Sequence, residues 1–359
     1  MSAIVLCIGP MVAIPRTAAT TFELSIAPLT GGISAVVFSV LFFLVIFLLC
    51  IRESAVVDIV GKVLTPLLLV GLLVLIIKGA VDPLGPLSAA AQTANIPGTG
   101  IKAGYQTMDV LAAMLFGILI LRSAENKGYR EPKAKTRVVA GAGIVAGAAL
   151  LVVYLGLTYL GASVSSLFDA GISRSALVLS IVESLLGRTG LVVFAIVVAL
   201  ACITTAVALV SASADYFSNL SGKRLSYPVL VIAICVFSAV VSNVGLDQLF
   251  AIASPILDIV YPPALVLIVL SFLRRGISPL VYRLATVGAL ITSSLGVLAT
   301  YTSLSLPVLD YLPFASLGFG WVMPAAVCGM IGLLLSRRGG GHTSPEKNPA
   351  WKENEQPDA

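Results

Sequence analysis

Long apolar runs with very few charges follow one another along most of this 359-residue chain. Hydrophobic residues make up 58% of the sequence and charged residues only 11%, whereas a soluble domain carries about 25% charged residues. A chain so poor in charge is not fully solvated by water, so we expect lipid to be its main solvent. Within lipid, helices satisfy their backbone hydrogen bonds internally. The sequence therefore predicts an all-α, polytopic membrane protein.

About ten of these runs approach the length of about 20 residues that a helix needs to cross a bilayer. Prolines interrupt the first and the eighth run, and the fourth run is short. A further segment, 173–186, is amphipathic and too short to span, so we expect it to lie at the membrane surface or to cap a cavity. The predicted spans are 2–26, 33–51, 63–80, 107–121, 138–160, 189–217, 228–244, 246–273, 281–302 and 317–335.

The basic residues of the loops are distributed unequally between the two sides of the membrane. If the N-terminus is cytoplasmic, the opposite loops contain only Lys102, Arg174 and Arg188. This is the positive-inside pattern, so we predict that both termini are cytoplasmic and that the net charge of +5 reflects orientation and not nucleic-acid binding. The cytoplasmic loops and tail then contain Arg52, Lys62, Arg122, Lys127, Arg130, Lys133, Lys135, Arg137, Lys223, Arg224, Arg274, Arg275, Arg337 and Arg338.

Two parts of the chain differ in composition. Residues 1–336 form the predicted transmembrane domain, and residues 337–359 are rich in Gly, Pro and charge, so we expect a disordered cytoplasmic tail. The five cysteines lie singly within apolar runs, and the one histidine, His342, lies in the tail. Because the sequence offers neither a nucleophile–base set nor a metal-ligand cluster, we predict that the chain is not an enzyme.

The first predicted span contains prolines and a charge at membrane depth. Pro10 and Pro15 remove helical hydrogen bonds, and Arg16 follows directly. A charged residue inside a membrane is costly and indicates function by default. The alternative is a structural pair with Glu23, which lies two turns further along the same face.

The fourth span begins with Gly104-Tyr105-Gln106-Thr107-Met108-Asp109. Gly104 permits a break in the helix, and the free N–H groups of a new helix start attract carboxylates. The alternative is a loop followed by an ordinary N-cap residue.

Two further spans contain groups that are unusual in lipid. Thr204 and Thr205 lie one turn after Ala201, and their oxygens suit a hard cation such as sodium, although such hydroxyls commonly bond the preceding turn of their own helix. Asp258 lies mid-span among Pro255, Pro262 and Pro263. It is either part of a kink or part of a gate or coupling device.

Four long stretches carry a resemblance to a known family. They are GPMVAIPRTAATTFELSIAPLTG from Gly9, GYQTMDVLAAMLFGI from Gly104, ACITTAVALVSASADYF from Ala201, and the run through VSNVGL and YPPALVLIVLSF. Together they resemble the branched-chain amino acid:cation symporters, the system II carrier proteins. The likeness extends over almost the whole chain except the tail.

The resemblance implies a fold and a set of site residues. The fold is the five-plus-five inverted repeat of the amino acid–polyamine–cation superfamily, present here in part, because the first segment is similar to the family's third span and the first two spans have no counterpart. The segment from Gly104 then becomes the broken sixth helix at the substrate site, and the A-x-x-T-[ST] spacing becomes a sodium-site helix. The implied substrate-binding residues are Arg16, Gly104, Tyr105, Thr107, Met108 and Asp109, and the implied sodium-binding residues are Ala201, Thr204 and Thr205.

The expected function is secondary active symport of leucine, isoleucine and valine across a bacterial inner membrane. The partners are then the amino acid, sodium or a proton, and the bilayer, with no cofactor beyond the coupling ion. Three alternatives remain open: a permease for another neutral amino acid, a proton-coupled cycle through Asp109 or Asp258, and a truncated fragment that does not transport.

Overall fold

The computed structural model describes residues 2–51, 55–87, 95–129, 131–168, 171–273, 277–302 and 307–338. Every regular element within these ranges is a helix, which confirms the all-α class. The chain divides into two compact units, one formed by residues 1–261 and 316–318 and the other by residues 262–315 and 319–359. The boundary falls inside one helix, α11 (Leu246–Leu273), at Tyr261-Pro262.

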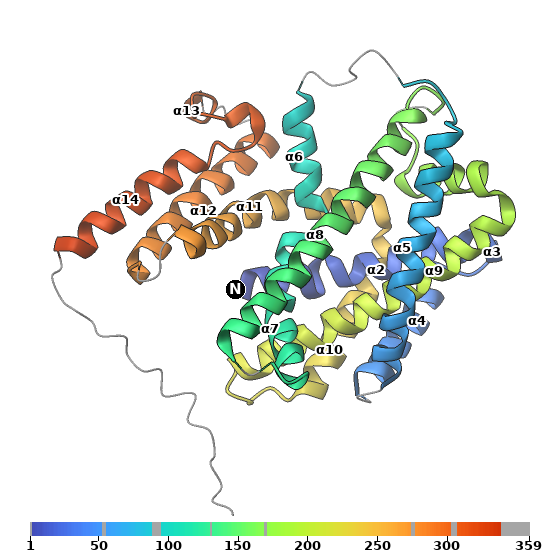
Figure 1. Ribbon diagram of the computed structural model, residues 1–359, viewed down its shortest axis with the longest axis horizontal. Coiled ribbons are helices and arrows are strands. Elements are labelled where there is room, and N and C mark those ends of the chain that lie inside the picture. The colour runs from blue at the N-terminus through green and yellow to red at the C-terminus, as the bar shows by residue number, and fades with distance from the viewer. Residues whose placement is uncertain are drawn as a thin grey trace, which may run out of the picture. The chain divides into compact units, whose positions relative to one another are not determined.

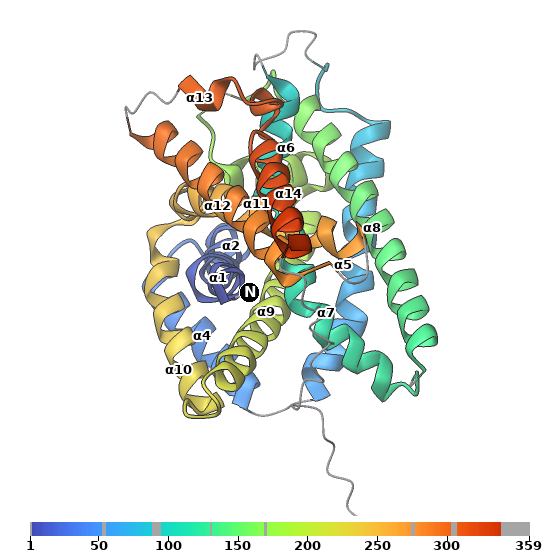
Figure 2. The ribbon, with the colours of Figure 1, turned by 90° about the vertical axis from the view of Figure 1, so that its left-hand side faces the viewer.

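The first unit begins with a run of short helical pieces and continues with longer helices (Figures 1 and 2). The opening pieces are α1 (Ser2–Leu6), the π-helical η1 (Cys7–Met11), α2 (Ala13–Thr21), the π-helical η2 (Phe22–Ile26) and α3 (Ala27–Thr30). The rest are α4 (Ala35–Ile51), α5 (Ala55–Val81), α6 (Ile96–Gln106), α7 (Asp109–Asn126), α8 (Pro132–Ser163), α9 (Arg174–Leu220), α10 (Tyr227–Val241), the 3₁₀ turn η3 (Ser242–Val244) and the start of α11.

The predicted spans correspond to apolar helices. Among the described residues, six helices are long and apolar enough to cross a membrane, and three shorter apolar helices cover 35–51, 65–81 and 322–336. Of the ten predicted spans, only 107–121 has no counterpart among these nine. Its helix, α7, includes Asp109, Arg122 and Glu125, which is more charge than an apolar span of 18 residues usually carries.

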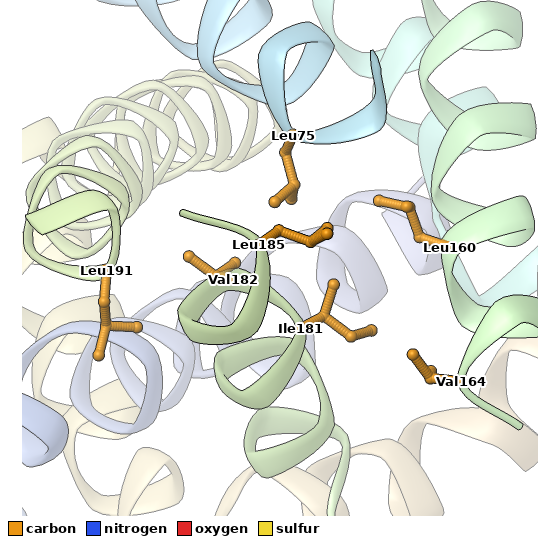
Figure 3. Close-up of a cluster of buried hydrophobic side chains, with 7 residues drawn as sticks. All are labelled: Leu75, Leu160, Val164, Ile181, Val182, Leu185 and Leu191. Atoms are coloured by element: carbon orange, nitrogen blue, oxygen red, sulfur yellow. The ribbon is translucent and has the colours of Figure 1, made fainter. Parts of the chain in front are cut away.

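A cluster of apolar side chains holds α5, α8 and the first part of α9 together (Figure 3). Gly187, with φ 69° and ψ −172°, kinks α9 after Leu186, so residues 174–186 form a separate helical segment, as the amphipathic pattern predicts. That segment turns its apolar face onto the neighbouring helices. The buried members of the cluster are Leu75, Leu160, Val164, Ile181, Val182, Leu185 and Leu191.

The second unit is built on α12 (Pro279–Tyr301) and α14 (Val322–Arg338), which lie side by side (Figure 1). A Cβ atom added to Gly288 would lie 2.8 Å from Sγ of Cys328, so the backbones approach as closely as small residues allow. The unit also contains α13 (Pro307–Asp310), and the 3₁₀ turn η4 (Ala315–Leu317) lies at its border with the first unit.

The prolines do not interrupt α11, which is one helix from Leu246 to Leu273, because neighbouring helices in a membrane protein can satisfy the freed backbone groups.

Several expectations lie outside the described residues: Arg52, Arg130, Arg274, Arg275 and the tail from residue 339, together with the side chains of Lys62, Arg122, Arg337 and Arg338. The backbone of α14 extends to Arg338.

Candidate functional site

One cavity of about 340 Å³ lies between α2, α5, α7 and α9 in the first unit. Its volume falls in the range of about 300–1,000 Å³ that small-molecule sites occupy. Its polar wall consists of Arg16, Thr17, Thr20, Thr107, Asp109 and Thr205. Leu68, Ala112, Phe116, Val198 and Leu209 line it with apolar side chains.

The break between α6 and α7 forms one edge of this cavity. Met108 adopts left-handed backbone angles, φ 63° and ψ 8°, and α7 begins at the next residue. A helix cannot continue through this conformation, so the first N–H groups of α7 have no partner in their own helix. Thr107 and Met108 both line the cavity, and Met108 is held in its strained conformation by nearly complete burial.

The break lies three residues later than the sequence suggested. Gly104 is an exposed residue inside α6 and does not line the cavity. Its carbonyl accepts a hydrogen bond of 2.8 Å from the Thr107 hydroxyl at the end of the helix. The expectation that Gly104 itself forms the break is therefore wrong. The residue with left-handed angles is Met108, which is held in that conformation by its burial, and not the glycine that lacks a side chain.

Tyr105 packs away from the cavity. Its ring is buried and stacks on that of Tyr261 in α11, with centroids 4.7 Å apart and planes inclined by 16°. The neighbouring Gln106 donates a 3.0 Å hydrogen bond from Nε2 to the Ser254 hydroxyl, also in α11. The proline-rich helix thus holds the end of α6 in place beside the break.

Arg16 connects α2 to the same break. Its Nη1 donates a 2.9 Å hydrogen bond to the carbonyl of Gln106, at the C-terminal end of α6 where a cation is favoured. Its guanidinium also lies 4.4 Å from the ring centroid of Phe250. Glu23 instead accepts a 2.9 Å hydrogen bond from the backbone N–H of Leu246. Arg16 and Glu23 thus bind different partners, and no ion pair among the described residues joins them.

Asp109 and Arg16 both line the cavity, so its wall contains one negative and one positive side chain. Its Oδ2 accepts a 2.6 Å hydrogen bond from the hydroxyl of Tyr154 in α8. The carboxylate also lies in the first turn of α7, where the helix dipole favours an anion. A cavity with one cationic and one anionic side chain matches the two charges of a zwitterion.

The predicted cation residues divide into two groups. Ala201 and Thr205 line the cavity, whereas Thr204 does not. The Thr204 hydroxyl donates back to its own helix, at 2.9 Å from the carbonyl of Ala201 and 3.2 Å from that of Leu200. This is the ordinary behaviour of a hydroxyl in a membrane helix.

Sequence reasoning missed several residues of this site. Thr17 and Thr20 follow Ala13 and Arg16 at helical spacing, so the three- and four-residue rule could have placed all four on one face. Tyr154 gives no such signal, because it lies in the apolar part of α8 and its contact with Asp109 joins residues 45 positions apart.

Comparison with known proteins identifies the chain's relatives. A family model described as "Branched-chain amino acid transport protein" matches residues 1–338. The branched-chain amino acid permease BrnQ of Escherichia coli K12 is 36% identical over 347 residues, which cover 93% of this chain and 78% of the permease. The permease BraB of Bacillus subtilis is also 36% identical, over 92% of this chain and 77% of its own length.

A third relative supports the same assignment. The branched-chain amino acid transport system 2 carrier protein of Pseudomonas aeruginosa is 36% identical over 93% of this chain and 78% of the carrier. These proteins are transporters and not enzymes, in agreement with the sequence analysis. The match confirms the resemblance noted from the four stretches of sequence, and the chain belongs to the branched-chain amino acid transport protein family.

Proposed function

We propose that this protein carries branched-chain amino acids across a bacterial inner membrane by sodium-coupled symport. The observation that carries the proposal is the cavity, whose wall combines the charged side chains of Arg16 and Asp109 with apolar side chains. The names of the relatives, all permeases or carriers for branched-chain amino acids, point to the same substrates.

The charges of the cavity suggest how the amino acid is oriented. Its carboxylate binds Arg16 beside the start of α7, where a helix N-terminus favours an anion. Its ammonium group binds Asp109, which Tyr154 holds in place. The aliphatic side chain then faces the apolar wall that includes Leu68 and Phe116.

The coupling ion belongs beside the substrate in this proposal. Ala201 and Thr205 border the cavity, and Thr204 keeps its oxygen lone pairs although its proton is donated to the helix. A sodium ion held by Ala201 and Thr205 would favour binding of the amino acid carboxylate, and alternating access would move both solutes together. Both termini lie in the cytoplasm in this arrangement, as the distribution of basic residues indicates.

Uptake of labelled leucine by proteoliposomes that contain the full chain tests the proposal. We expect the conservative substitution Asp109→Asn to raise KM for leucine about 100-fold, because an ammonium group loses its charged partner. Asp215→Asn is the matched control, since Asp215 is exposed on α9 and does not line the cavity. Thr205→Ala should weaken the dependence of uptake on sodium.

A competition experiment with a substrate analogue distinguishes the loss of an Asp109–ammonium contact from a general loss of structure in Asp109→Asn. The deaminated analogue 4-methylpentanoate lacks the ammonium group, so it should compete poorly with leucine in the wild type and relatively better in Asp109→Asn. Unchanged kinetics in Asp109→Asn, or the absence of leucine uptake by the wild type, would contradict the proposed function.

A further inference from the structure

We infer that a second cation site, for a sodium ion, lies between Glu23, Ser39, Ser242 and Asn243, outside the substrate cavity. The four side chains surround a smaller cavity of about 80 Å³ in the first unit. They come from η2, the beginning of α4 and the turn η3, so three segments distant in the sequence meet there. None of the four lines the larger cavity.

The geometry of the backbone suits a cation. Glu23 lies in a π-helical segment, an irregularity that is frequent at functional sites. Helix α10 and its 3₁₀ extension end at Val244, and Gly245 leaves the helical conformation with φ 96° and ψ 152°. The last carbonyls of a helix point outward with the negative end of its dipole, and such ends bind sodium in transporters.

The hydrogen bonds leave these side chains with oxygen lone pairs but few protons. Ser39 donates its hydroxyl proton to the carbonyl of Val36 at 2.9 Å, and Ser242 donates to the carbonyl of Ala239 at 3.0 Å.

Asn243 completes this pattern. Both hydrogens of its Nδ2 are used, one towards Ser39 at 2.9 Å and one towards the carbonyl of Ala239 at 2.6 Å. The amide oxygen therefore remains as an acceptor, and Asn243 lines the cavity together with Glu23 and two serines whose hydroxyl protons are already donated. Side chains that offer only acceptors suit a hard cation better than an anion.

The charge of Glu23 leads to the same inference. It lies in an apolar segment, and the ion pairs among the described residues are Lys78–Asp82, Lys135–Glu125 and Arg174–Asp247, so none neutralises it. Its Oε1 accepts the N–H of Leu246 at the start of α11, and a helix N-terminus supplies about half an elementary charge. A bound monovalent cation would supply the remaining compensation.

The ion would reach the site from solvent on one side. Asn243 is exposed, whereas Ser39 and Ser242 are buried, so the cavity opens at the amide and closes at the hydroxyls. A proton would need only the carboxylate, whereas a hard cation is bound by several oxygen ligands. The set of four oxygens favours sodium.

Sodium binding to the purified full chain tests the site without any transport. We expect ²²Na⁺ to bind the wild type, with a Kd that rises about 100-fold in Glu23→Gln because the charge is lost. Gln retains an oxygen for the Leu246 N–H, so this variant keeps the structural hydrogen bond. Asn243→Ala should raise the Kd about tenfold, and the exposed Glu183→Gln is the matched control. A Kd unchanged in both Glu23→Gln and Asn243→Ala would overturn the inference.

The role of the site in coupling rests on the proposed function, and a second measurement separates the two. In proteoliposomes, Glu23→Gln should lose leucine accumulation driven by a sodium gradient but retain leucine–leucine exchange, which needs no net movement of the ion. Absence of exchange in the wild type would refute the proposed function and leave the sodium binding to be judged by its Kd. Accumulation driven by a proton gradient in sodium-free solution, and lost in Glu23→Gln, would overturn the sodium assignment.

Discussion

Helix α9 contributes to two regions of the first unit, one tightly packed and one open. Before Gly187, its side chains Ile181, Val182 and Leu185 are buried in the apolar cluster with α5 and α8 (Figure 3). After Gly187, the same helix presents Val198, Ala201 and Thr205 to the cavity of about 340 Å³. The first region is filled by side chains, and the second keeps an open space with charges at its edge.

The difference follows from the solvent. Lipid tails are as apolar as leucine, so helices in a membrane gain little from burying apolar surface and associate through close packing and hydrogen bonds. The cluster is such a packed contact. Broken backbone at membrane depth is tolerated only beside a cavity or other protein, and the break at Thr107-Met108 lies at the cavity edge.

The largest expected difference in leucine uptake is between substitutions of two arginines whose guanidinium groups contact the same ring. Arg16 and Arg174 lie 4.4 Å and 4.2 Å from the centroid of Phe250, but only Arg16 lines the cavity. We expect Arg16→Gln to lower the ratio of maximal uptake rate to KM for leucine about 100-fold, because the substrate carboxylate loses a charged partner. Arg174→Gln should change it less than about threefold, since that side chain is half exposed. Equal losses in the two variants would remove the distinction between cavity and surface.

A substitution in the apolar cluster should have the reverse effect. Leu160 is 2% exposed and contacts the cluster from α8. We expect Leu160→Ala to lower the free energy of unfolding by about 2 kcal/mol, because it opens a void among packed side chains. Chemical unfolding in detergent micelles measures this change, and KM for leucine should stay at the wild-type value. A change in KM without loss of stability would show that the two regions are not independent.

Filling the cavity should alter selectivity more than stability. Ala112 lines the apolar wall in α7, next to Asp109 at the helix start. Ala112→Leu places a larger side chain where we expect the substrate's aliphatic group, so leucine should lose about tenfold in affinity and the smaller valine less. Competition of both amino acids against labelled isoleucine measures the ratio. A ratio equal to that of the wild type would place the aliphatic group elsewhere.

The smallest effect concerns backbone strain. Met108 and Lys223 both have φ 63°, but Met108 lines the cavity and Lys223 is an exposed residue in a turn. We expect Lys223→Gly to raise the free energy of unfolding by about 1 kcal/mol or less, because glycine adopts this conformation without the steric penalty. Uptake should not change. Met108→Gly relieves the same strain but removes a buried side chain from the cavity wall, so leucine uptake should fall, and equal uptake in both variants would contradict this view.

The sequence marked the positions of most site segments, but it did not reveal which way their side chains point. The prolines and Arg16 marked the first break, and the structure has non-helical angles at Gly9. The segment from Gly104 marked the second, although the break lies at Thr107-Met108 and Tyr105 turns towards Tyr261. No sequence pattern distinguishes Thr204, which bonds its own helix, from Thr205, which lines the cavity.

The sequence alone determined that this protein is helical, belongs in lipid and interrupts its apolar helices at a few marked positions, because these properties depend on local composition. Only the tertiary structure decided which side chains share a space. In a soluble helix the apolar stripe identifies the inner face, but a helix in lipid is apolar all round, so its sequence does not reveal which face looks inward. The partnership of Arg16 with Gln106, of Glu23 with Leu246 and of Asp109 with Tyr154 therefore became visible only in the folded chain.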